Sequence, residues 1–97
     1  MKAVFIAYNM ALTDRVDYLL DRMGVRGYTQ WTSIAGRGTE TGEPRKGTHT
    51  WPELNNAILS IMPDEKVPDI LQYIAKMDEV NEKVGIRAFV WDVVGGY

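Results

Sequence analysis

The sequence predicts an α+β domain in which a four-stranded antiparallel sheet carries two helices on one face. Two observations support this prediction. Four short runs are rich in apolar or β-branched residues, and two other segments have apolar residues at helical spacing. Their order along the 97 residues is strand, helix, strand, strand, helix, strand. The length suits one domain, which we expect to span residues 1–97.

The first half of the chain is expected to form two strands around a helix. Residues 2–8 (KAVFIAY) are apolar and rich in β-forming residues, which predicts a buried strand. Residues 10–23 predict an amphipathic helix, because apolar side chains recur every three or four positions and Gly24 can end the helix. Residues 25–36 (VRGYTQWTSIAG) have no helical period and contain β-branched and aromatic side chains, which predicts a long strand.

The second half repeats the pattern after a polar loop. Residues 54–62 predict a strand that Pro63 ends. A helix is expected to start close to Pro68, and Gly85 separates it from the last strand, residues 86–94. The buried side of this helix is predicted to contain Val67, Ile70, Leu71, Ile74 and Met77.

This order of elements is typical of the ferredoxin-like fold, in which right-handed crossovers place both helices on one face of the sheet. The other face then has no cover from its own chain. The strands are nevertheless apolar on both sides: Val4 and Ile6 alternate with Phe5, and Ala88 and Val90 alternate with residues such as Phe89. Soluble monomers avoid such a patch, so the sequence predicts an oligomer that packs these faces together.

Composition narrows the classes of function. A net charge of −2 offers no bulk attraction for nucleic acid. The absence of cysteine excludes disulfides and thiolate metal sites. The N-terminal apolar run is too short for a signal-peptide core or a membrane span. We therefore expect a soluble cytoplasmic protein with no nucleic-acid partner and no membrane insertion.

The polar loop, residues 37–52, is the main candidate for function. Long loops without secondary structure are uncommon in compact domains, and binding residues concentrate on loops. The loop has charges of both signs, so we expect it to dock a protein target. The residues expected to contact that target are Glu40, Glu43, Arg45, Lys46 and Trp51. Trp51 and Trp31 are alternatively core or subunit-contact residues.

His49 is the one histidine of the chain, and Glu40 and Glu43 lie near it. One imidazole with carboxylates can bind a divalent cation in an open site. The alternative is a surface or turn histidine that hydrogen-bonds the backbone. Both interpretations stay open from sequence.

Catalysis and a P-loop are both disfavoured. In the run GRGTETGEPRKG, Lys46 precedes Gly47 and a strand follows, whereas a P-loop ends in Gly-Lys-Ser/Thr before a helix. Asp92, within an apolar strand, is the one acid–base candidate, and no partner for it can be argued. The sequence therefore predicts a protein that is not an enzyme.

The order of elements, the loop between the second and third strands and the run SIAGRG (residues 33–38) resemble the PII signal-transduction superfamily, which includes the CutA-like metal-tolerance proteins. The resemblance covers the whole chain. It implies a homotrimer with sheets facing inward, effector binding in clefts between subunits, and a loop that docks on a target such as a transporter or enzyme. The implied effector or anion contacts are Gly36, Arg37, Gly38, Lys83 and Arg87.

The sequence also departs from the PII pattern. The stretch TGxxGDGK, through which PII proteins bind ATP or ADP, is replaced by residues 78–89, where Gly85 stands near Lys83 and Arg87. The C-terminal arginine segment is missing, and the loop has no tyrosine for uridylylation. These departures argue against the family's usual nucleotide site and leave the effector unknown. Three hypotheses follow: a PII-like regulator, a divalent-metal protein of CutA-like type, or a small enzyme that uses an intersubunit cleft.

Overall fold

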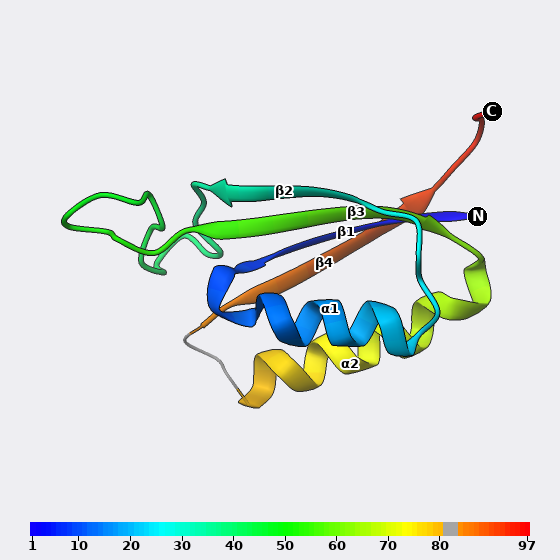
Figure 1. Cartoon of the computed structure of the whole chain (residues 1–97), viewed down its shortest axis with the longest axis horizontal. Coiled ribbons are helices and arrows are strands. Elements are labelled where there is room, and N and C mark those ends of the chain that lie inside the picture. The colour runs from blue at the N-terminus through cyan, green and yellow to red at the C-terminus, as the bar shows by residue number, and fades with distance from the viewer. Residues whose placement is uncertain (81–83) are drawn as a thin grey trace.

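The structure is a computed structural model that describes residues 1–80 and 84–97. Four antiparallel strands form one sheet in the order β2-β3-β1-β4, and both α-helices cover one face of it (Figure 1). The α+β, ferredoxin-like fold predicted from the sequence is thereby confirmed. The elements are β1 (Lys2–Asn9), η1 (Met10–Leu12), α1 (Thr13–Arg22), β2 (Thr29–Ile34), β3 (Asn55–Met62), η2 (Asp64–Lys66), α2 (Val67–Val80) and β4 (Ile86–Asp92).

Several element boundaries differ from the prediction. The strand expected over residues 25–36 is shorter, Thr29–Ile34, and it is irregular near its end, where Ser33 has a positive φ of 56° and the pairing register shifts between Trp31 and Ile34. The Ser33 amide donates instead to the Asn56 side-chain oxygen at 2.9 Å. The last strand ends at Asp92 rather than at residue 94, and the first helix begins with the 3-10 turn η1.

The core lies between the helices and one face of the sheet. It contains Val4, Ile6 and Tyr8 of β1 together with Val16 and Leu20 of α1. On α2, Val67, Ile70 and Ile74 are buried as predicted, but Leu71 is exposed because it lies on the side of the helix away from the sheet. Tyr8 is buried, and its hydroxyl accepts a hydrogen bond from the Gln30 amide at 3.1 Å.

The face of the sheet opposite the helices, here called the open face, is apolar and uncovered in the single chain. Cross-strand pairing places Phe5 beside Leu59 and Phe89 on this face. Phe89 is 60% exposed and Trp91 is 50% exposed. Phe5 also packs against Trp31, with ring centroids 6.5 Å apart. Strands that are apolar on both sides, as the sequence predicted, thus leave an aromatic surface that residues 1–80 and 84–97 do not cover.

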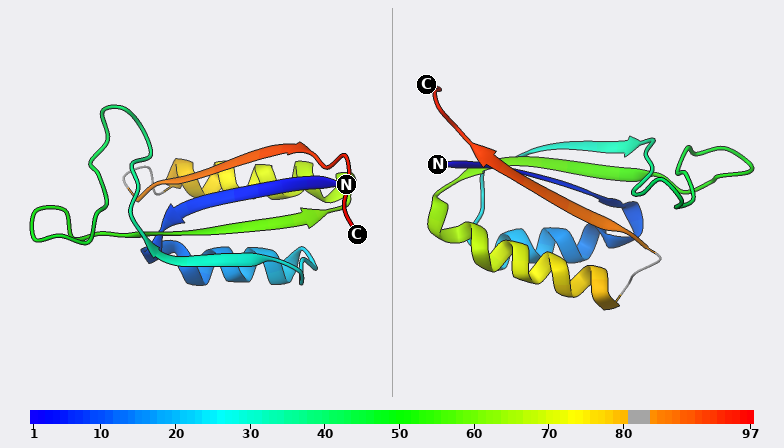
Figure 2. Two further views of the ribbon diagram at one scale, coloured as in Figure 1. Left: turned by 90° about the horizontal axis from the view of Figure 1, so that it is seen from above. Right: turned by 180° about the vertical axis from the view of Figure 1, so that it is seen from behind.

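The loop between β2 and β3 projects beyond one end of the sheet, and both termini lie at the other end (Figure 2). Within the described ranges, no helix has both the length and the apolar character needed to cross a membrane.

Candidate functional site

A hollow of about 860 Å³, here called the loop-base pocket, lies where the loop meets the open face. Its walls include aromatic side chains of the open face, such as Phe5 and Phe89, the segment from Ile34 to Glu43, and the entry to β4 from Gly85 to Arg87. The pocket therefore joins the apolar face that the fold leaves uncovered to the polar loop that the sequence singled out.

Four residues predicted to contact an effector meet in this pocket. Gly36, Arg37 and Gly38 come from the loop, and Arg87 comes from β4. Glu43 and Arg45, predicted as docking residues, line it as well. The fifth predicted effector contact, Lys83, lies outside the described residues.

Arg87 is held at the pocket by an acid that the sequence patterns did not indicate. Its guanidinium donates to the Asp78 carboxylate at the end of α2, with an N–O distance of 3.1 Å. Both side chains are partly exposed, so solvent weakens the pair. Asp78 and Arg87 are nine positions apart and are separated by a connection, which is why no helical spacing connected them in the sequence.

Arg37 gives the pocket a second cation. Its Nε donates to the Gly42 carbonyl at 2.6 Å, and the Gly42 amide donates to the Thr39 hydroxyl at 2.8 Å. These bonds fold residues 37–42 into a compact turn. The Arg37 side chain remains exposed, so its two terminal nitrogens can reach a ligand in the pocket.

Arg45 is buried, although the sequence placed it among the predicted docking residues. Only 9% of it is exposed. Its guanidinium donates to the Val84 carbonyl at 2.5 Å and to the Asn55 side-chain oxygen at 3.3 Å. Its backbone pairs with Gly36 in both directions, at 2.8 and 2.7 Å. Arg45 thus makes its contacts within the chain and exposes little of its side chain to a partner.

The Gly36–Arg45 pair divides the loop into two parts that are visible in Figure 2. The inner lobe, residues 36–45, forms a wall of the pocket. The outer lobe, residues 46–53, is a separate turn in which the Lys46 and Thr48 amides donate to the Trp51 carbonyl at 3.3 and 2.9 Å. Lys46 and His49 are exposed in the outer lobe, and Trp51 is half-buried.

The metal interpretation finds no support in this arrangement. Glu40 and Glu43 belong to the inner lobe and His49 to the outer lobe. Over residues 1–80 and 84–97, no three histidine or acidic side chains come together in a way that could hold a metal ion.

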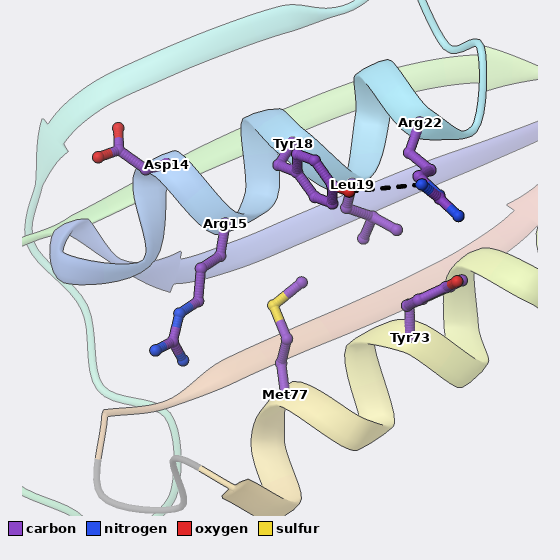
Figure 3. A pocket seen from close by; sticks show the side chains of 7 residues that line it. All are labelled: Asp14, Arg15, Tyr18, Leu19, Arg22, Tyr73 and Met77. Atoms are coloured by element: carbon purple, nitrogen blue, oxygen red, sulfur yellow. Dashed lines mark hydrogen bonds between the residues drawn. The ribbon is translucent and has the colours of Figure 1, made fainter.

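A second hollow, here called the helix groove, lies between α1 and α2 on the side opposite the open face (Figure 3). It has a volume of about 480 Å³. Arg15, Tyr18 and Arg22 of α1 and Tyr73 and Met77 of α2 line it. The Arg22 guanidinium lies 3.5 Å from the Tyr18 hydroxyl. The groove contains none of the site residues that the sequence selected, so it provides matched arginines for control substitutions.

A family model and several solved structures match this chain. The family model for nitrogen regulatory protein P-II matches residues 1–95. Comparison with curated protein sequences gives no match. Among solved structures, CPII, a nitrogen regulatory PII-like protein from Thiomonas intermedia K12 bound to ADP, AMP and bicarbonate, has a TM-score of 0.77 and 26% identity, covering 95% of this chain and 84% of that chain. A CPII structure bound to ADP and bicarbonate gives the same values.

A second similar protein of known structure is a candidate PII-like signalling protein from Thermus thermophilus. It has a TM-score of 0.65 and 26% identity, and the match covers 95% of this chain and 85% of that chain. The similarity to both proteins therefore extends over nearly the whole chain and is not confined to one element.

Proposed function

Because this chain belongs to the nitrogen regulatory protein P-II family, we propose that it is a small regulatory protein and not an enzyme. In this proposal it binds an anionic effector in the loop-base pocket and a target protein through loop residues 37–52. The observation that carries the proposal is the meeting of Arg37 and Arg87 with the backbone of Gly36 and Gly38 at one hollow. Two guanidinium groups beside the exposed backbone of Gly38 suit a phosphate or carboxylate.

The effector that we favour is an adenine nucleotide, with ADP as the first candidate. The similar protein CPII was solved with ADP, AMP and bicarbonate. The pocket here also has an apolar side, formed by Phe5 and Phe89, against which a purine ring can stack. Since the family's TGxxGDGK stretch is missing, Arg37 and Arg87 would supply the phosphate contacts in this chain.

We also propose that the pocket is completed by a second copy of the chain in a homotrimer. Phe5 and Phe89 line the pocket and also belong to the open face. A neighbouring subunit that covers the open face would therefore border the pocket. Burial of each large apolar side chain would contribute roughly 1.5–3 kcal/mol to such an assembly.

Calorimetry with ADP, with and without bicarbonate, tests the effector proposal. Arg37→Gln and Arg87→Gln should each weaken ADP binding about tenfold, because each removes a charge-assisted hydrogen bond. Arg15→Gln and Arg22→Gln remove the same charge from the helix groove and should leave the affinity unchanged. Equal losses at both places would mean that only net charge matters, and no binding to the wild-type chain would refute an ADP effector.

The metal alternative can be separated from this function by one variant. His49→Ala removes the only imidazole of the chain. If the protein is a zinc-binding regulator, that variant should lose zinc and retain ADP. Zinc uptake that is unaltered by His49→Ala would refute a site on the loop.

A further inference from the structure

We propose that Arg45 is the positioning residue that builds the loop-base pocket, by fastening the inner lobe of the loop to the entry of β4. This inference rests on the proposed function for its binding readout. It assigns Arg45 a task inside the chain, in place of the contact with a target that its position in a polar loop suggested.

The backbone of Arg45 holds the first wall of the pocket. Its amide and carbonyl exchange hydrogen bonds with Gly36, which closes the inner lobe as a ring of residues. Arg37 and Gly38 follow Gly36 directly and face the pocket. The position of these residues is therefore fixed through Arg45.

The side chain of Arg45 holds the second wall. Its Nη2 donates to the Val84 carbonyl at 2.5 Å, and the residues that follow, from Gly85 to Arg87, line the pocket. Val84 is 39 positions from Arg45 in the sequence. A single residue thus joins two segments that each carry one of the pocket's arginines.

Two glycines leave room for this guanidinium and for its partner Asn55. Gly85 has a φ of +90°, and a Cβ at Gly85 would lie 2.5 Å from Arg45 Nη2. A Cβ at Gly36 would lie 2.6 Å from the side-chain nitrogen of Asn55, which also accepts from Arg45 through its oxygen. Any larger residue at either position would displace the guanidinium or its partner.

The guanidinium is bound by fewer partners than it can take. Its Nε is buried and makes no hydrogen bond within the described part of the chain. The Glu53 carboxylate lies 3.8 Å from Nε, beyond hydrogen-bond distance, and is largely exposed. The hydrogen bonds that the guanidinium does make, to Val84 and Asn55, are therefore the contacts that hold it between the two walls.

The test removes the Arg45 side chain by substitution and then supplies a free guanidinium group in solution. Arg45→Ala should keep the wild-type fold and weaken ADP binding about tenfold, because the two walls are no longer preorganised. The amides of Gly36 and residue 45 should exchange with deuterium about tenfold faster, since their pairing opens more often. Methylguanidinium should restore both properties, because it can occupy the space between Val84 and Asn55. Lys46→Ala, the matched control, removes an exposed neighbouring cation and should change neither.

The outcomes separate this proposal from the proposed function. If Arg45→Ala has wild-type affinity and exchange, or if methylguanidinium restores neither, Arg45 does not position the pocket. If the wild-type chain fails to bind ADP, the effector proposal is wrong, and the exchange measurements still decide the role of Arg45. If Arg45→Ala does not fold, Arg45→Lys decides: it keeps the charge but cannot reach Val84 and Asn55 together, so affinity and exchange equal to wild type would overturn the proposal.

Discussion

The Arg87 guanidinium lies 3.1 Å from the Asp78 carboxylate, so one of the arginines that line the loop-base pocket is already paired within the chain. An anionic effector must therefore compete with Asp78 or share Arg87 with it. Because the pair is partly exposed, its strength is expected to be about 0.2–1 kcal/mol. The effector can overcome a competitor of that size.

The first prediction is that Asp78→Asn tightens ADP binding. The substitution keeps the size of the side chain and removes the competing charge, so affinity should rise about two- to fivefold, in line with the free energy of an exposed pair. Calorimetry at low ionic strength measures this gain. A weaker affinity would show that Asp78 is needed to aim Arg87.

The second prediction concerns the open face. Phe89→Glu should convert the proposed trimer into monomers, because an unpaired charge buried between subunits costs about 3–5 kcal/mol. Light scattering after size-exclusion chromatography gives the mass. The matched control is Tyr18→Glu, which alters a similarly exposed aromatic residue on the helix side and should leave the trimer intact. A wild-type chain that elutes as a monomer would refute the assembly itself.

The third prediction is a loss of stability at high pH that depends on Tyr8. Burial raises the pKa of the Tyr8 hydroxyl above its ordinary value of 10, although the hydrogen bond from Gln30 partly offsets the rise. A raised pKa in the folded state means that the unfolded chain ionises first. The contribution of the neutral Tyr8 hydroxyl to the free energy of unfolding is therefore complete below about pH 10 and is lost as the pH rises further.

Urea unfolding between about pH 9 and pH 11 measures this loss. Tyr8→Phe should flatten the decline over that range, and it should lower stability at neutral pH by about 0.5–1.5 kcal/mol through loss of the hydrogen bond. Tyr18→Phe, at an exposed tyrosine, should do neither. An unchanged high-pH decline in Tyr8→Phe would mean that another group controls it.

The fold followed from the sequence because its signals are local. Helical spacing and β-rich runs, with Gly24, Pro63 and Gly85 as boundaries, placed the elements to within a few residues. The exception is β2, which starts later than expected and has an irregular end, where the Ser33 amide bonds to the side chain of Asn56, 23 positions away. A pairing of that kind is set by the tertiary structure and leaves no local pattern.

Only part of the site was predictable from the sequence. A resemblance to a family pointed to Gly36–Gly38 and Arg87, which the structure brings to one pocket. The role of Arg45 depends on its hydrogen bond to Val84, which crosses the base of the loop. The role of Asp78, at the end of α2, depends on its pair with Arg87. Neither contact leaves a local pattern in the sequence. A charged residue in a polar loop is normally exposed, so composition alone placed Arg45 on the surface.

The last prediction is that the two lobes of the loop can be separated experimentally. Replacing Gly47–Thr50 with Asn-Gly shortens the outer lobe while keeping Lys46 and Trp51, whose backbones are joined at 3.3 Å. Because residues 47–50 do not line the pocket, ADP affinity should change less than about threefold, well within the effect of one hydrogen bond. The trimer should persist, since the open face is untouched. Deleting Thr39–Lys46 should instead abolish ADP binding, because it removes Arg45 together with the pocket wall. Calorimetry and light scattering on both variants measure these outcomes, and a shortened outer lobe that also loses ADP would show that the loop acts as a single unit.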